Sequence, residues 1–154
     1  MLGDKDIVDF AVFYHDAIYN VLRKDNEERS AEMAVERLTK IGVPEHTARD
    51  AGIFIRATQS HQAPADFPAI NDLRFFLDFD MSILGTERKA YRVYKENVRK
   101  EYRLIPAALY RPGRKKFLQT CLQSEFIFHT REFQARYEAQ ARSNLQWELE
   151  TDYQ

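Results

Sequence analysis

The sequence has few of the residues that interrupt helices or cross-link chains. Its 154 residues include only 5 glycines and 5 prolines, and most of these fall between segments of helical periodicity, as expected of an all-α protein. The single cysteine, Cys121, excludes an internal disulfide, and the N-terminus lacks a signal-peptide pattern, so we expect a cytoplasmic protein. No His–Cys arrangement surrounds Cys121, and we interpret it as a small apolar residue.

The sequence also lacks a large net charge and long apolar runs, and both absences exclude classes of function. Lys and Arg number 23 against 24 Asp and Glu, which gives a formal net charge of -1. This balance argues against a protein that coats nucleic-acid polymers or binds membrane surfaces. No apolar run approaches the length of a membrane span. Hydrophobic residues make up 44% of the chain, the composition of a folded protein, and the length predicts a single domain over residues 1–154.

Hydrophobic periodicity predicts an all-α, compact multi-helix bundle. The first helix, from about Asp6 to Arg23, is apolar nearly all round and is expected to lie at the centre of the core. Further helices are expected over about 26–41, 44–60, 70–84, 86–102 and 114–122, and from 130 to near the end of the chain. Thr86 and Thr130 are the expected N-caps, and Pro106 and Pro112–Gly113 should bracket a short element.

One histidine and one aspartate are adjacent in the first predicted helix, in the stretch FYHDAIY. Burying His15 or Asp16 in so apolar a helix costs free energy unless the side chain is paired or bound to a metal. Neighbouring helical residues point about 100° apart, so one cation can contact both side chains. A His–Asp dipeptide alone is weak evidence, and a core histidine beside a surface aspartate is the alternative.

Acidic residues recur in two later segments. Asp78 and Asp80 lie in the apolar stretch FLDFDMSILG, where two residues so spaced point to different sides of a helix and only one is expected to face the core. Glu27 and Glu28 lie in DNEERS, which by itself is typical of a capped helix start with an exposed charged turn.

The order of these segments along the chain resembles that of the HD superfamily of metal-dependent phosphohydrolases. Within the superfamily the chain is similar to a bacterial family of predicted HD phosphohydrolases, over about residues 10–150. The similar stretches are FYHDAIY, DNEERSAEMA, TQSH, LDFDMSILG, EYRLIPAALYRPGR and ARSNLQWEL. Six stretches in one order are far more specific than any one of them. The resemblance implies an HD-type helical bundle that hydrolyses a small phosphate ester, with a nucleotide as one candidate.

The resemblance also implies which residues bind the metal. The His–Asp pair corresponds to His15 and Asp16, and the later aspartate corresponds to Asp80 in preference to Asp78. Mixed nitrogen and oxygen ligands suit Mn²⁺, Fe²⁺, Co²⁺, Ni²⁺ or Zn²⁺ better than Ca²⁺. The expected cofactor is therefore a divalent transition metal.

Further residues receive roles by the same resemblance or by their chemistry. Glu28, or with less support Glu27, would orient or deprotonate the attacking water. His61 of TQSH would support the metal ligands or face the phosphate, with an ordinary helix-terminal histidine as the alternative. Arg111 and Arg114 flank Pro112–Gly113 at a predicted helix N-terminus, a setting that favours phosphate binding, although runs of charge usually form a solvated face.

The resemblance fails at one ligand. Family members carry a histidine-bearing helix ahead of the His–Asp helix, whereas no histidine precedes His15 in this sequence. The chain is thus N-terminally short relative to the family, and we expect three of four protein ligands and weaker metal binding. Two other functions remain open: a degenerate HD module that binds a nucleotide or protein partner without catalysis, and a helical scaffold whose stripe of Tyr91, Tyr94 and Tyr102 forms a homodimer seam.

Overall fold

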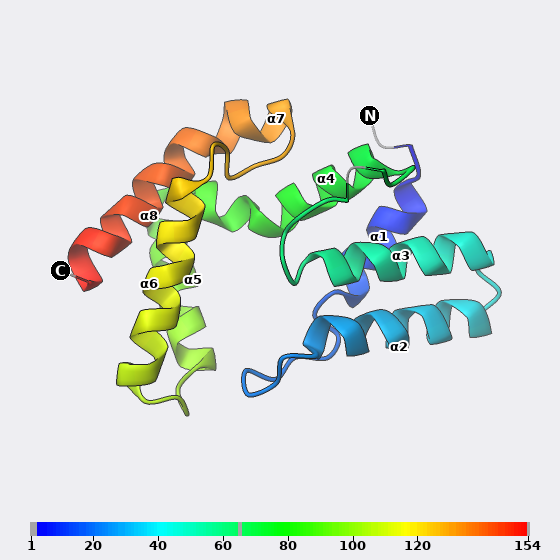
Figure 1. Cartoon of the computed structure of the whole chain (residues 1–154), viewed down its shortest axis with the longest axis horizontal. Helices are drawn as coiled ribbons and strands as arrows, with labels where there is room; N and C mark the ends of the chain where they lie inside the picture. The colour runs from blue at the N-terminus through cyan, green and yellow to red at the C-terminus, as the bar shows by residue number, and fades with distance from the viewer. Residues whose placement is uncertain (1–2, 65, 154) are drawn as a thin grey trace. The chain divides into compact units, whose positions relative to one another are not determined.

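The computed structural model describes residues 3–64 and 66–153. Helices make up 71% of the residues that it describes, and no strand occurs among them (Figure 1), so the all-α prediction is confirmed. The chain divides into two compact units, Met1–Asp80 and Met81–Gln154. Each unit has its own buried core, and a single domain over residues 1–154 stays a prediction.

The first unit is built from four helices. These are α1 (Lys5–Tyr14), α2 (Asn26–Lys40), α3 (Glu45–Ala57) and α4 (Ile70–Met81), whose last residue lies just beyond the unit. Helices α2 and α3 lie side by side, and α1 packs against both (Figure 1). The turn between α2 and α3 contains Gly42 at φ 84°, a left-handed conformation that glycine adopts at little cost.

Small side chains let the helices of the first unit approach closely. Its core contains Ile7, Val8, Ala11, Ala31, Ala34, Leu38, Ala48, Ala51, Phe54, Ile55, Leu73, Phe76 and Leu77. A Cβ at Gly52 of α3 would lie 2.8 Å from Cγ2 of Val35 on α2. The start of α1 is held by the buried carboxylate of Asp72, which accepts hydrogen bonds from the backbone N–H groups of Gly3 and Asp4.

The predicted first helix is wrong in its length and in its burial. Helix α1 ends at Tyr14 instead of near Arg23, and Phe13 is 75% exposed and Leu22 66% exposed. The chain leaves the helix because backbone groups at Ile18 and beyond bind side chains of α2, which offer an alternative to helical hydrogen bonds. His15 and Asp16 therefore follow the end of a helix and do not lie in the middle of one.

The second unit consists of shorter helical segments around a smaller core. The elements are η1 (Ser82–Gly85), α5 (Arg88–Glu101), α6 (Ala107–Gln123), α7 (Arg131–Phe133), the π-helical η2 (Gln134–Glu138) and α8 (Ala139–Asp152). The buried core residues are Leu84, Tyr91, Leu118, Cys121, Phe128, Ala141 and Leu145. Helix α8 contacts η1, η2 and α6, so it links most elements of the unit.

Helix α6 corrects the prediction of a break at Pro112–Gly113. The helix begins at Ala107, after Pro106, and continues through Pro112 to Gln123. Proline lacks the N–H that would bond one turn back, and the helix tolerates the loss of that single bond. Arg111 and Arg114 consequently lie inside a helix, and the expectation that a helix N-terminus presents them to phosphate is wrong.

The predicted caps have mixed outcomes. Thr130 caps α7, since its side chain accepts a hydrogen bond from the N–H of Phe133. Thr86 does not cap α5: the helix follows Glu87, and the Thr86 hydroxyl donates to the carbonyl of Ile83.

In the part of the chain that the structure describes, no helix combines the length and the apolar character needed to cross a bilayer.

Candidate functional site

The His15 side chain is held in one orientation at the end of α1. Its Nδ1 lies 2.9 Å from the carbonyl oxygen of Val12, which can only accept, so Nδ1 donates this hydrogen bond and Nε2 is left for other contacts. The ring meets Phe76 of α4 edge to face, with 6.1 Å between centroids. These contacts fix the orientation of the ring, as a hydrogen bond from the other ring nitrogen does for metal-binding histidines.

Two carboxylates flank the Nε2 atom of His15. Oδ2 of Asp16 lies 3.4 Å away and Oδ1 of Asp80 lies 3.6 Å away. The second oxygen of Asp80 lies 2.9 Å from Nε2 of His61. All four residues belong to the first unit, and Asp80 on α4 is the residue that connects the two histidines. Asp78, the alternative ligand, is buried, with 1% of its surface exposed.

His61 reaches Asp80 from an unusual backbone conformation. Its φ is 53°, a left-handed value that is uncommon for residues other than glycine and carries a small conformational cost. Its N–H donates to the carbonyl of Ala57 just after α3. Thr58, the first residue of TQSH, is buried and donates its hydroxyl to the carbonyl of Ile55. The end of α3 thus directs His61 toward Asp80.

The segment that follows the His–Asp pair is fixed by two polar side chains of α2. Ser30 accepts a hydrogen bond from the N–H of Ile18 and donates to its carbonyl. Asn26, one helical turn earlier, binds the N–H and the carbonyl of Asn20 in the same way. Both lie in DNEERS, whose local sequence suggested only a cap and a charged turn. The buried residues of that motif therefore organise the loop beside the site.

Replacing Ser30 with alanine is expected to lower the free energy of unfolding by about 1–2 kcal/mol, because the N–H and carbonyl of Ile18 lose their partner. Urea unfolding followed by circular dichroism measures the change. Ser60→Ala is the matched control, since Ser60 is an exposed serine of the same unit. Equal stability of the two variants would contradict the anchoring role of Ser30.

The predicted acid residues Glu28 and Glu27 differ in their surroundings. Both carboxylate oxygens of Glu28 accept hydrogen bonds from Arg56 of α3, at 2.7 and 2.8 Å. The hydrogen bonds from Arg56 lower the pKa of Glu28, so its carboxylate is ionised at neutral pH. Glu27 is half-buried. No local pattern indicates the contact with Arg56, because 28 residues separate the partners.

The remaining predicted site residues belong to the second unit. Arg114 is buried and binds the carboxylate of Glu148, at 2.9 and 3.0 Å. Arg111 donates to the backbone carbonyl of Asp152. Cys121 is buried and burial raises the pKa of its thiol, which agrees with its interpretation as an apolar residue. The structure therefore brings together His15, Asp16, Asp80 and His61, and it places the two arginines among contacts of the second unit.

The donor atoms around His15 match a divalent transition metal in their chemistry. An imidazole nitrogen and two carboxylate oxygens are ligands of such ions, and two ligands of one ion at about 2.1 Å each lie roughly 3–3.5 Å apart. Within residues 3–64 and 66–153, however, no three His, Cys, Asp or Glu side chains meet as a formed metal site. Asp16, whose side chain is 71% exposed, has the freedom to turn toward a cation.

No protein-family model matches the chain, and no curated protein or solved structure matches it either.

Proposed function

We propose that the first unit is an HD-type phosphohydrolase site that cleaves a small phosphate ester, with His15, Asp16 and Asp80 holding a divalent metal ion. The supporting observation is that Nε2 of His15 lies near carboxylate oxygens of Asp16 and Asp80, at 3.4 and 3.6 Å. Asp16 is the next residue in the sequence, whereas Asp80 is distant from His15 and is brought to it by the fold. The resemblance of the motifs to HD phosphohydrolases points to the same three residues.

The cation, when bound, would supply a water molecule of lowered pKa and polarise a phosphoryl oxygen. His15 contributes a preset ring orientation, because its Nδ1–H donates to the carbonyl of Val12. Asp80 contributes one oxygen on the side of His15 and holds His61 with the other. This arrangement orients the imidazole of His61 without using the oxygen that faces His15.

His61 and Glu28 are the residues that we assign to the phosphate and to the electrostatics of the site. The His61 side chain is 32% exposed, so a substrate oxygen can reach its ring, and an imidazole is suited to bind phosphate or to protonate a leaving group near neutral pH. The lowered pKa of Glu28 makes its carboxylate a weaker base. We therefore assign Glu28 a positioning role through Arg56 in preference to proton abstraction.

Metal binding is the direct test of this proposal. Adding Mn²⁺, Co²⁺ or Ni²⁺ to the purified chain should raise the temperature of unfolding, since a ligand at 100 times its Kd stabilises the native state by about 2.7 kcal/mol. His15→Ala and Asp80→Asn should abolish the shift. His46→Ala should retain it, because His46 is an exposed histidine of the same unit. An identical shift in all variants, or no shift for any of the metals, would refute the metal site.

Turnover separates the enzyme from a module that binds without catalysis. Phosphate release from 4-nitrophenyl phosphate and from nucleoside monophosphates is expected with metal, and Asp80→Asn should reduce it by at least about 100-fold, the size typical of lost metal-site residues. Specific metal binding without turnover on any of these esters would favour the degenerate module.

A further inference from the structure

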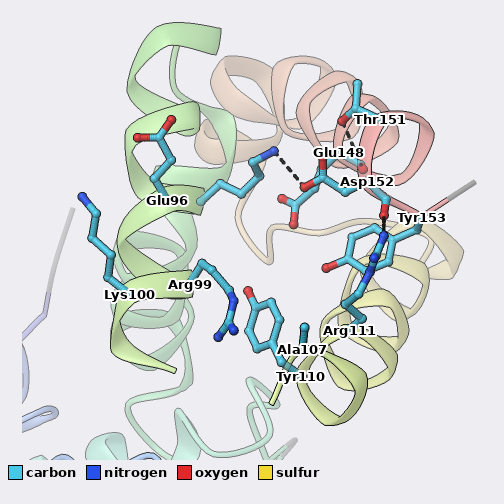
Figure 2. Close-up of a pocket in the computed structure, with 11 residues that line it drawn as sticks. Glu96, Arg99, Lys100, Ala107, Tyr110, Arg111, Glu148, Thr151, Asp152 and Tyr153 are labelled. Carbon is cyan, nitrogen blue, oxygen red and sulfur yellow. Dashed lines mark hydrogen bonds and ion pairs between the residues drawn. The ribbon is translucent and has the colours of Figure 1, made fainter. Parts of the chain in front are cut away.

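A pocket in the second unit lies outside the proposed metal site. Its volume is about 590 Å³, and residues of α5, of α6 and of the end of α8 line it (Figure 2). Most of its lining surface is apolar. The residues that matter for its chemistry are Lys95, Arg99, Lys100, Tyr110, Arg111 and Tyr153.

Three of the cationic side chains in this pocket contact groups without net charge. Arg99 donates to two backbone carbonyl oxygens, the nearer being that of Tyr102 at 2.7 Å. Arg111 donates to the backbone carbonyl of Asp152. Lys100 lies 3.4 Å from a side-chain amide oxygen. Among residues 3–64 and 66–153, none of these three side chains forms a salt bridge, so no described carboxylate pairs with their positive charges.

Two of the three carboxylates that line the pocket already form ion pairs. Glu148 binds the buried Arg114 through both of its oxygens. The Asp152 carboxylate accepts a hydrogen bond from Lys95 at 2.8 Å. Glu96 is the third acidic lining residue. After these pairs are set aside, three positive charges face one negative charge, so the pocket favours an anion.

Two tyrosine rings give the pocket flat walls. The Arg99 guanidinium lies 4.8 Å from the ring centroid of Tyr110, and that of Arg111 lies 5.7 Å from the centroid of Tyr153. Burial raises the pKa of Tyr110, and it raises the pKa of Tyr153 to about 12. Both phenols therefore stay neutral at physiological pH and do not repel an anion. Each ring stands beside a guanidinium group (Figure 2).

We propose that this pocket binds a small aromatic anion, whose ring lies against Tyr110 and Tyr153 while the excess positive charge of Arg99, Lys100 and Arg111 attracts its phosphate, phosphonate or sulfonate group. The volume lies within the roughly 300–1,000 Å³ of sites for small organic ligands. A planar arginine fork is well matched to such an oxyanion. The proposal uses residues of the second unit alone and is independent of the proposed hydrolysis.

The test titrates the full chain with 1-naphthylphosphonate, which has a ring and an anion but no ester bond to hydrolyse, in buffer containing EDTA. Isothermal titration calorimetry gives the Kd, and amide chemical shifts locate the ligand. Inorganic phosphate and 1-naphthol supply the anion alone and the ring alone, and each should bind at least about tenfold more weakly. Shift changes are expected at Tyr110, Arg111 and Tyr153.

Variants separate this pocket from non-specific attraction to a basic helix. Lys100→Gln and Arg111→Gln, both at exposed positions, should each raise the Kd about tenfold. Arg92→Gln removes the same charge from an exposed position of α5 outside this pocket and should leave the Kd unchanged. Equal weakening in all three variants, shift changes confined to the first unit, or no binding at millimolar ligand would overturn the proposal. Loss of metal-dependent turnover has no bearing on these outcomes.

Discussion

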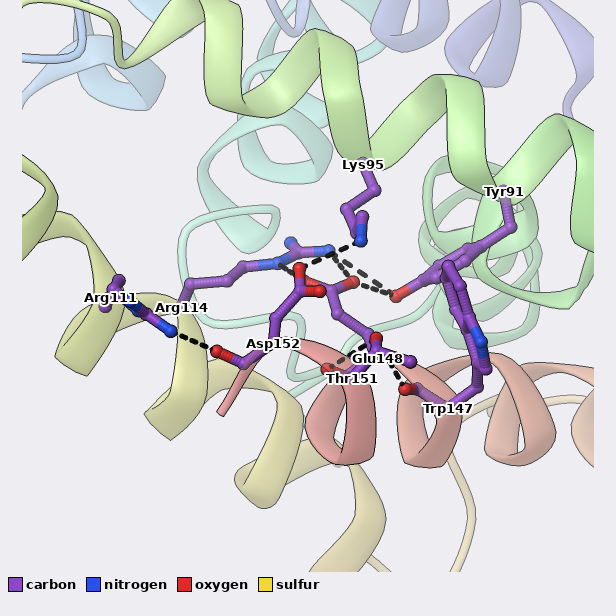
Figure 3. A network of polar contacts seen from close by, with 8 residues as sticks. All are labelled: Tyr91, Lys95, Arg111, Arg114, Trp147, Glu148, Thr151 and Asp152. Carbon is purple, nitrogen blue, oxygen red and sulfur yellow. Dashed lines mark hydrogen bonds and ion pairs between the residues drawn. The ribbon is translucent and has the colours of Figure 1, made fainter. Parts of the chain in front are cut away.

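Replacing Glu148 with leucine is expected to lower the free energy of unfolding of the second unit by about 3–5 kcal/mol, because the variant leaves a buried guanidinium without its counter-charge. The Arg114 side chain is 7% exposed and that of Glu148 is 1% exposed. Figure 3 shows the Glu148 carboxylate between Arg114 and the hydroxyl of Tyr91. Arg114 cannot reach water in place of the lost partner without rearrangement of the core.

The contacts explain why the pair is tolerated in the wild-type chain. Arg114 binds Glu148 at 2.9 and 3.0 Å, and Tyr91 donates to the same carboxylate at 2.6 Å. Burial opposes the charge of Arg114, but its hydrogen bonds and its attraction to Glu148 and Tyr94 together outweigh burial and raise its pKa. Burial and the neighbouring carboxylate raise the pKa of Tyr91, so its hydroxyl keeps the proton that it donates. Because Tyr91 is fully buried here, it cannot contribute to a homodimer seam.

Fluorescence of Trp147 during urea unfolding measures this effect, because it is the only tryptophan of the chain and lies in the second unit. The control is the double variant Glu148→Leu with Arg114→Met, which removes both charges. It should recover more than about 1 kcal/mol of the loss, as replaced buried ion pairs do. A double variant that is less stable than the single one by the full cost of a second core substitution would argue against the ion pair as the cause.

Replacing Gly85 with alanine is expected to destabilise the second unit by about 3 kcal/mol, at the upper end of the overpacking range. A Cβ at Gly85 would lie 2.5 Å from Cβ of Tyr137, 2.8 Å from its carbonyl oxygen and 3.0 Å from its Cα. These atoms belong to the backbone of η2 or are fixed to it, so no side-chain rotation relieves the clash. The close approach of η1 and η2 therefore depends on this glycine.

Gly113→Ala is the matched control, and it is expected to raise the free energy of unfolding instead of lowering it. Gly113 is exposed inside α6, and a Cβ there would meet nothing within 4 Å. Alanine has the higher helix propensity, so this variant should gain up to about 1 kcal/mol. Trp147 fluorescence and circular dichroism during urea unfolding compare the two variants. A Gly85→Ala chain as stable as the Gly113→Ala chain would show that η1 and η2 can separate without cost.

The sequence predicted the helices best where local signals decide them. Periodicity and flanking breakers placed α2 and α3 to within a few residues, and the cap at Thr130 is confirmed. The errors arise where long-range contacts override local preference. The segment after Tyr14 looked helical because it is apolar, but Ser30 holds its backbone in another conformation. At Pro112 the helix continues although a local rule predicts a break.

In the candidate site, too, sequence patterns identified residues but did not reveal contacts that depend on long-range packing. Motif order selected His15, Asp16, Asp80 and His61, which lie together in the first unit. The pairing of Glu28 with Arg56 depends on the packing of α2 against α3, which motif order does not report.

Two residues of the terminal stretch ARSNLQWEL now have an architectural explanation. Asn144 is fully buried and donates to the carbonyls of Leu84 and Thr86, at 2.8 Å each. Arg142 donates to three backbone carbonyls, of which that of Leu122 lies at the end of α6. Both side chains satisfy carbonyl groups where helical segments end. Neither role has a local pattern by which sequence reasoning could identify it.

The left-handed backbone conformation of His61 also limits which residues can replace it. A β-branched or bulky residue would be strained at φ 53°, whereas glycine and asparagine adopt that conformation readily. We therefore expect glycine or asparagine to be tolerated at this position better than valine or isoleucine. The backbone geometry of one residue thus separates substitutions that remove only the imidazole from those that also strain the fold.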